Sequence, residues 1–141
     1  MDHKQLDELV RLGGKVVEIR LNNGRRAIGY LEMADTDRIA LRAINLKGGV
    51  GPISYRSTQS SGFTRLDQAE PISIEHNPPK PGTRIVIRLK SNVQVCGYTI
   101  AATDKQVTLA REIFGNGRNK RSHCHFSSNI ESTYVLKPIE N

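Results

Sequence analysis

The side chains best suited to chemistry in this sequence are cations and imidazoles near its C-terminal end. Arg118, Lys120 and Arg121 follow a Gly-Asn-Gly stretch, and His123 and His125 come shortly after them. Concentrated cations on flexible backbone suit a polyanion, and nucleic acid is the usual one. The alternative interpretation is a solvated basic loop that only keeps the protein soluble.

The segment His123-Cys124-His125 also contains possible metal ligands. On a β-strand the two imidazoles face one side and the thiol faces the other, so the three groups cannot easily bind one ion. We therefore expect no metal site and no cofactor. The sequence also lacks a Gly-x-Ser-x-Gly elbow, a phosphate-binding loop and a carboxylate pair set apart from ordinary turns, so an enzyme is not expected.

The charge of the chain is unevenly distributed. Its 141 residues carry a net charge of +7. Residues 1–78 hold 11 Lys/Arg against 10 Asp/Glu, a net +1, whereas residues 79–141 hold 10 against 4, a net +6. The first residues are charged and no run of about 18 apolar residues exists, so we expect a cytoplasmic protein. There Cys96 and Cys124 are expected to be reduced thiols.

The elements that must position these side chains occur twice. Gly14–Leu21 matches Gly82–Leu89 at an offset of 68 residues, and 8 of the 28 positions from 14 to 41 are identical in the two copies. A self-match at a fixed period indicates repeated structural units. The match resumes with Ser60-Ser61 on Ser127-Ser128, one residue out of phase. This slip predicts a single deletion in one loop.

Each copy has the pattern of short strands. Residues 17–21 alternate apolar and polar side chains, and Ile85, Ile87 and Leu89 alternate in the same way with Val86 and Arg88. Asn22-Asn23-Gly24 is typical of a tight hairpin turn, and its counterpart in the second copy is Lys90–Val93. Gly29 and Gly97 lie inside the second strands, where glycine favours a sharp bend. Each copy is expected to form about five short antiparallel strands. A helix over residues 2–12 precedes them, with Asp2 as its cap.

The order of these motifs resembles that of the Sm-like proteins, most nearly their bacterial Hfq form. Val17–Gly24, followed by Gly29–Asp35 and Ile39–Leu41, is similar to the first motif of that family. Tyr55-Arg56 is similar to the aromatic–basic step of the Hfq second motif, although Ser57 follows it in place of the Hfq histidine. In the second copy His123–His125 occupies the corresponding strand.

The resemblance implies a mainly β fold. We expect two tandem, five-stranded, strongly bent antiparallel barrels of the Sm-like or SH3-like type, with a short N-terminal helix. The first barrel and the helix are assigned to residues 1–76, a Pro-rich linker to residues 77–82, and a second, more basic barrel to residues 83–141. Sm-like units assemble edge to edge, fourth strand to fifth strand, so three chains are expected to close a ring of six barrels.

In this family the turn after the second strand and the loop after the fourth line the pore of the ring. Together with the need for aromatic and cationic contacts to single-stranded RNA, this implies a set of RNA contacts. Tyr55 could instead be a core or interface aromatic, and Arg38 and Lys105 could be ordinary turn residues. The predicted contacts are Arg38, Tyr55, Arg56, Lys105, Gln106, Arg118, Lys120, Arg121, His123 and His125.

The leading prediction is a non-catalytic protein that binds single-stranded RNA through basic loops and pore-lining turns. The chain has seven aromatic residues of the Phe, Tyr and Trp types and none is Trp. Affinity is therefore expected to rest on phosphate contacts and to depend on salt. The alternative is a protein–protein interaction or assembly module that uses the barrel edges without binding RNA.

Overall fold

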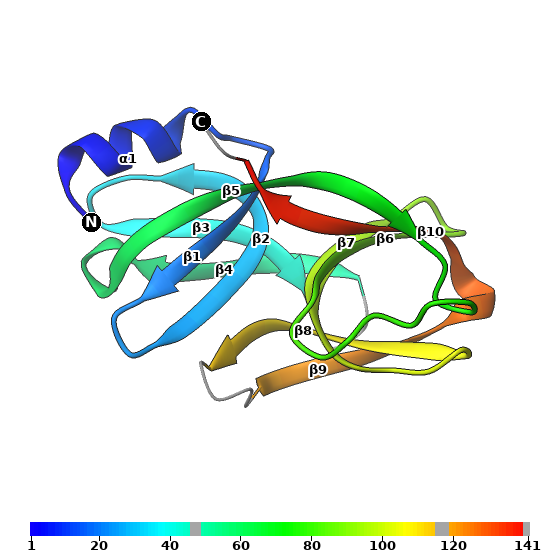
Figure 1. The fold of residues 1–141 in the computed structure, drawn as a ribbon. Coiled ribbons are helices and arrows are strands. Elements are labelled where there is room, and N and C mark those ends of the chain that lie inside the picture. The colour runs from blue at the N-terminus through cyan, green and yellow to red at the C-terminus, as the bar shows by residue number, and fades with distance from the viewer. Residues whose placement is uncertain (46–48, 115–118, 140–141) are drawn as a thin grey trace.

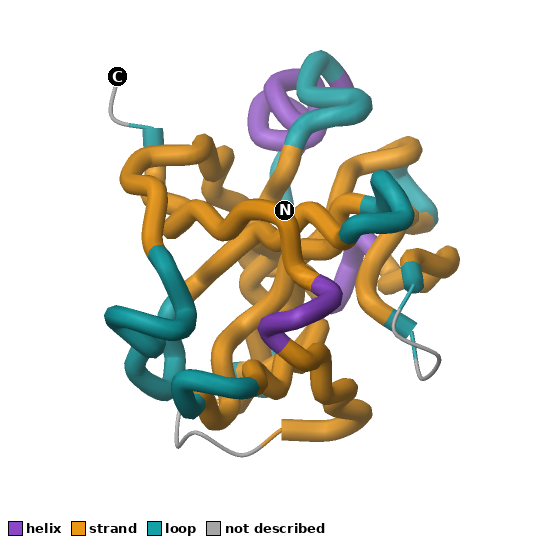
Figure 2. The backbone as a smooth tube through the Cα atoms, turned by 90° about the vertical axis from the view of Figure 1, so that its right-hand side faces the viewer, coloured by secondary structure: helices purple, strands orange, loops and turns teal. Residues whose placement is uncertain are grey.

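The structure is a computed structural model that describes residues 1–45, 49–114 and 119–139. One helix comes first and strands form most of the remaining backbone (Figure 2). The elements are α1 (His3–Val10), β1 (Val16–Leu21), β2 (Arg25–Ala34), β3 (Arg38–Ile44), β4 (Val50–Arg56), η1 (Ser57–Gln59), β5 (Ser60–Ile72), β6 (Arg84–Leu89), β7 (Gln94–Ala102), β8 (Gln106–Phe114), β9 (Asn119–Phe126), η2 (Ser127–Asn129) and β10 (Ile130–Pro138).

The predicted helix is confirmed, and its start is set by a capping box. The Asp2 carboxylate accepts a hydrogen bond from the backbone N–H of Gln5 at 2.8 Å, and the Gln5 side chain accepts one from the N–H of Asp2 at 3.1 Å. These bonds satisfy two donors that helix geometry leaves unpaired. Leu6 and Leu9 are buried against the first unit, so α1 packs through one face.

The same order of strands occurs in both halves of the sheet. Neighbouring strands in the first half are β5-β1-β2-β3-β4, and in the second half β10-β6-β7-β8-β9. Each half is therefore an antiparallel run in which the fifth strand lies beside the first. The strand order is thus the same in the two halves, while the tandem repeat of two five-stranded units stays a prediction.

Glycine is needed inside the second strand of each copy, at Gly29 and Gly97, for the same structural reason. A Cβ atom at Gly29 would lie 2.8 Å from the carbonyl oxygen of Arg42, and one at Gly97 would lie 3.0 Å from that of Ala110. Real Cβ atoms essentially never come as close as at Gly29 and rarely as close as at Gly97, so the second and third strands approach each other here more closely than a side chain readily permits. The predicted glycine bend is consistent with this close approach.

The predicted single deletion is wrong. The 3₁₀ turns Ser57–Gln59 and Ser127–Asn129 occupy equivalent places, an offset of 70 residues. The strand pairing agrees, because Phe63 lies opposite Ile19 and Thr133 lies opposite Ile87. The second copy therefore has two additional residues between its third strand and its 3₁₀ turn. A match between two serine dipeptides carries little information about register, which is why the offset at these residues differs from the structural one.

The predicted pair of separate five-stranded barrels is confirmed only in part. Strand β5 continues to Ile72 and pairs with β10, and β2 pairs with β8. The strands β2-β1-β5-β10-β6-β7-β8 thereby close a single antiparallel barrel of seven strands, while β3, β4 and β9 extend from it (Figure 1). Local patterns predict strands but not which strands of the two copies meet.

The register between β5 and β10 is the one expected if a two-fold axis relates the two strands. Asp67 lies opposite Lys137, and these two positions are equivalent at the offset of 70 residues. On one side of this pair Leu66 lies opposite Pro138, and on the other side Gln68 lies opposite Leu136. At the offset of 70 residues Leu66 is equivalent to Leu136 and Gln68 to Pro138, so the second pair repeats the first with the copies exchanged. The two units therefore meet here in the way that the subunits of a symmetric dimer meet.

The core has three parts. One cluster belongs to the first unit and includes Leu9, Ile19 and Leu41. A second cluster combines both units, with Ile28 and Leu66 from the first and residues 86, 96, 98, 113 and 136 from the second. The third belongs to the second unit but also contains Ile44 and Ile74. The shared residues bind the units together, and the boundary at residues 77–82 stays a prediction.

Two buried carboxylates connect the units. Glu18 on β1 is 2% exposed and accepts two hydrogen bonds from the Arg84 guanidinium, at 2.8 and 3.0 Å, and one from the Tyr98 hydroxyl at 2.7 Å. Here the first unit supplies the carboxylate and the second supplies the arginine and tyrosine.

Around the second buried carboxylate, Glu112, the two units exchange roles. Glu112 on β8 is 7% exposed. It accepts a hydrogen bond from Arg25 at 3.0 Å and another from the Tyr55 hydroxyl. The carboxylate now comes from the second unit, and the arginine and tyrosine from the first. Each unit thus inserts one carboxylate into an Arg–Tyr pair of the other.

The charge of Glu18 is favoured in the folded state. Burial alone would raise its pKa, but the hydrogen bonds from Arg84 and Tyr98 and the charge of Arg84 together hold the pKa below the ordinary value of 4.5. A lowered pKa adds stability above the pKa of the unfolded chain. That contribution is lost as the pH falls through the lower, folded pKa.

We expect Glu18→Gln to lower the free energy of unfolding by about 3 kcal/mol at neutral pH, because it leaves Arg84 without its carboxylate. Urea denaturation measures the change. Glu70→Gln is the matched control: its ion pair with Lys137 is exposed, with 62% and 55% of the side chains accessible. The control is expected to lose much less, because solvent screens an exposed ion pair. Equal losses in the two variants would show that breaking the buried cluster costs no more than breaking an exposed ion pair, which would contradict this expectation.

Candidate nucleic-acid interface

The turn between β2 and β3 holds Arg38 in place. The Asp35 carboxylate accepts hydrogen bonds from the backbone N–H groups of Asp37 and Arg38 at 2.8 and 2.9 Å, and these bonds lower its pKa. Ser57 ties the turn to η1, because its hydroxyl donates to the Asp35 carbonyl at 2.6 Å and its N–H to that of Asp37 at 3.1 Å. Arg38 therefore starts from a fixed backbone.

Arg38 and Arg56 come together on the outer side of the β3–β4 pair. They lie directly opposite each other in the register, and both are exposed. Neither forms an ion pair with any carboxylate among residues 1–45, 49–114 and 119–139. Like charges directly opposite on a sheet are destabilising, so this pair favours a bound anion. Two of the predicted contact residues thus form one cationic site.

Tyr55 lies inside the fold. Its side chain is 9% exposed and its hydroxyl donates to Glu112 of the second unit. Burial and the neighbouring Glu112 charge raise the pKa of Tyr55. Because the ring belongs to the first-unit core, it offers no free face to a base. Its position supports the alternative interpretation of a core aromatic.

The equivalent surface of the second unit is less charged. The Thr103 hydroxyl accepts a hydrogen bond from the Lys105 N–H at 3.2 Å, and the Ser127 N–H donates to the Lys105 carbonyl at 2.8 Å. Gln106 lies opposite Phe126, whose ring is 56% exposed. This exposed aromatic was not among the predicted contacts. The β7–β8 turn and the end of β4 lie on opposite sides of the molecule (Figure 1).

His123 and His125 are neighbours on the inner side of β9. They lie opposite Leu109 and Val107, both fully buried, and their ring centroids are 4.9 Å apart in an edge-to-face arrangement. His125 is 7% exposed, and burial together with His123 lowers its pKa to about 4. His125 is therefore neutral at physiological pH. Among the described residues, no group of three His, Cys, Asp or Glu side chains could hold a metal ion.

The two histidines line a pocket of about 380 Å³, here called the histidine pocket. Its other walls come from the β6–β7 turn, with Lys90 and Ser91, and from Asn129 of η2. Leu89, Val93 and Gly49 complete it. Sequence reasoning assigned Lys90 and Ser91 only to a turn. The hairpin pattern that predicts the turn gives no sign that it faces the fourth strand.

Two of the remaining predicted contacts, Lys120 and Arg121, lie at the start of β9. The backbones of Lys120 and Arg121 belong to this strand, and Lys120 is opposite Glu112. Arg118 lies outside the described residues. The prediction that these cations bind RNA therefore stays a prediction.

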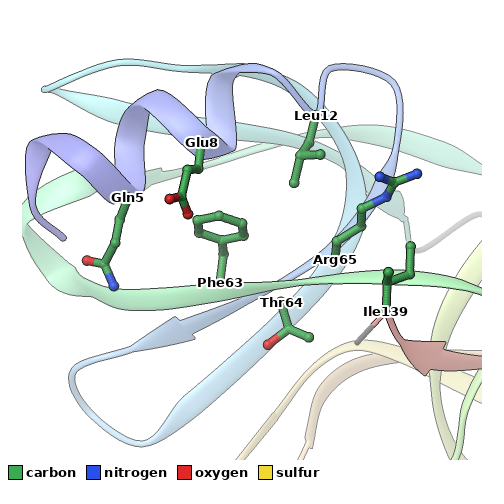
Figure 3. Close-up of a pocket in the computed structure, with 7 residues that line it drawn as sticks. All are labelled: Gln5, Glu8, Leu12, Phe63, Thr64, Arg65 and Ile139. Carbon is green, nitrogen blue, oxygen red and sulfur yellow. The ribbon is translucent and has the colours of Figure 1, made fainter. Parts of the chain in front are cut away.

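A groove with a volume of about 410 Å³ separates α1 from β5 (Figure 3). The Phe63 ring points toward the helix beside the Glu8 carboxylate, and Arg65 and Ile139 lie at the other end. A carboxylate in the groove disfavours a phosphate. We therefore place no nucleic-acid contact here.

No protein-family model, curated protein or solved structure matches this chain. The described residues include no helix long and apolar enough to cross a membrane.

We expect Tyr55→Phe to reduce the free energy of unfolding by about 1–3 kcal/mol, because one oxygen of the buried Glu112 then loses its donor. Its affinity for RNA should equal that of the unaltered protein. Tyr134→Phe is the control, since its half-buried hydroxyl has no hydrogen bond within the described part of the chain. Urea midpoints and RNA titrations of both variants decide the question. If Tyr55→Phe is as stable as the unaltered protein but binds RNA more weakly, Tyr55 contacts RNA and this expectation is wrong.

Proposed function

We propose that this chain is a non-catalytic protein that binds single-stranded RNA, built from two Sm-like units. The observation that supports binding most directly is the exposed pair Arg38 and Arg56, which occupy opposed positions on β3 and β4 and form no ion pair within 4.0 Å among the described residues. The Sm-like part of the proposal is supported by the repeated strand order and by a 3₁₀ turn before each fifth strand.

The arrangement of Arg38 and Arg56 suits phosphate. A guanidinium presents a planar set of donors that can hold two phosphate oxygens at once. Two such groups on neighbouring strands can contact consecutive phosphates of a flexible single strand. The net charge of +7 adds a general attraction for RNA. Binding of this kind is expected to weaken steeply with salt.

A protein-interaction module is the second candidate, and the sheet edges favour it. Strands β4 and β9 stand at the two ends of the strand order and pair on one side only within the described residues. An open edge can accept a strand from a partner. Pro52 lies within β4 and removes one donor from that edge, so β9 is the better candidate.

The RNA proposal is tested by neutralising the arginine pair. We expect Arg38→Gln with Arg56→Gln to weaken the binding of an unstructured RNA about tenfold, and to reduce the slope of log K against log salt by about 1.4, for two lost phosphate contacts. Fluorescence anisotropy over a salt series measures both quantities.

The matched control is Arg11→Gln with Lys15→Gln. Both residues are exposed near the end of α1, and the change in net charge is the same. If both double variants lose affinity equally, the attraction is only a matter of net charge. If the unaltered protein does not bind RNA even at low salt, the proposal fails and a protein partner at the β9 edge becomes the better explanation.

The three-chain ring is a separate proposal. Edge-to-edge rings join a fourth strand to a fifth, whereas in this chain the fifth strands β5 and β10 pair with each other. Ring closure would therefore have to use the remaining edges at β4 and β9. Light scattering of the purified chain decides between the mass of three chains, expected for the ring, and the mass of one chain, which would exclude it.

A further inference from the structure

The histidine pocket contains a buried polar atom without a partner. His125 is only 7% exposed. Its Nε2 atom is inaccessible to solvent and has no hydrogen-bond partner among the described residues. A buried polar group left unpaired costs about 1–3 kcal/mol, so natural proteins keep few of them. This makes His125 an unusual residue in the wall of a pocket.

The symmetry of the chain explains why His125 lacks a partner. His125 occupies the position of Tyr55, since both precede a 3₁₀ turn by two residues. Tyr55 donates to Glu112 of the other unit. Up to the end of the third strand the two copies are offset by 68 residues, so the counterpart of Glu112 is Ile44. The side chain of Ile44 has no polar atom that could bond to His125. The second unit thus has an imidazole where the first has a tyrosine that is already bonded.

We propose that the histidine pocket binds one nucleotide, with the base beside His123 and the phosphate at Lys90. The inference deepens the proposed RNA function and rests on it for the source of the nucleotide. Single-stranded RNA and free nucleoside 5′-monophosphates share this chemistry. The volume of about 380 Å³ lies in the range of roughly 300–1,000 Å³ that is usual for ligand pockets.

The walls of the pocket divide into parts that match a nucleotide. Leu89 and Val93 supply apolar surface for a flat ring, and imidazoles are among the rings on which RNA bases stack. Ser91 and Asn129 add a hydroxyl and an amide that can read the base or the ribose. Lys90 is exposed, so its ammonium can reach a phosphate at the entrance.

The backbone around the pocket is already ordered. The N–H of Lys90 donates to the carbonyl of Asn129 at 2.9 Å, which joins the β6–β7 turn to η2. Asn92 adopts a left-handed conformation with φ of 69°, and the N–H of Leu89 donates to the carbonyl of Val93 at 2.9 Å, closing the turn. A pocket held in this way loses little conformational freedom when it binds.

The test is a ¹⁵N–¹H NMR titration of the full chain with uridine and adenosine 5′-monophosphates. We expect shifts at the backbone amides of Ser91, Val93 and Asn129, and about tenfold weaker binding in Lys90→Gln, which loses a charge-assisted contact. Lys15→Gln, an equally exposed lysine near α1, should bind as the unaltered protein does. Ribose 5-phosphate, which has no base, should bind more weakly than either nucleotide.

Two results would overturn the inference. One is the absence of shifts at these three amides with both nucleotides at millimolar concentration. The other is an equal response to ribose 5-phosphate, which would indicate an anion site only. If RNA still binds through Arg38 and Arg56 in either case, the proposed function stands while the inference fails. If the nucleotides bind but RNA does not, the proposed function fails and the pocket serves free nucleotides.

Discussion

The structure depends on two buried carboxylates, each inserted into the other unit. Glu18 meets Arg84 and Tyr98, and Glu112 meets Arg25 and Tyr55. Removing charges from water is costly, so such clusters add little net stability over an apolar core, but a misaligned pair would leave a charge buried and unpaired. The clusters therefore penalise any other arrangement of the two units. Apolar contact alone, which is not directional, would permit several.

The contact between the fifth strands follows from this arrangement. With Asp67 opposite Lys137 near a two-fold axis, each unit offers the other the same strand, as in a symmetric dimer contained in one chain. The same axis places equivalent parts of the two units on opposite sides of the molecule, as the β2–β3 and β7–β8 turns show (Figure 1). The open strands β4 and β9 are the equivalent fourth strands, and the chain therefore has two separate surfaces rather than one continuous one.

The sequence predicts what depends on local chemistry. The cap at Asp2, the alternation in the first strands and the glycines at 29 and 97 act within a few residues or between strands adjacent in the chain, and these predictions agree with the structure. The contacts between units depend on residues far apart in the chain. Nothing near Glu112 in the sequence indicates Arg25 as its partner, and the extension of β5 to Ile72 looks like an ordinary polar strand end. Tyr55 was misleading for the same reason, because its decisive contact is in the other copy.

The differences between the two units follow from what the fold requires at each position. Before each 3₁₀ turn the fourth strand presents two inner residues, Ile53 and Tyr55 in the first unit and His123 and His125 in the second. The first pair fills the core and satisfies Glu112, so under the proposed function this unit would bind through its outer arginines. In the second unit the Nε2 atom of His125 has no hydrogen-bond partner among the described residues, and both histidines border a pocket. A symmetric pair of binding surfaces is therefore not expected. Contact with phosphate through the first unit and recognition of a base through the second is the division that these side chains support.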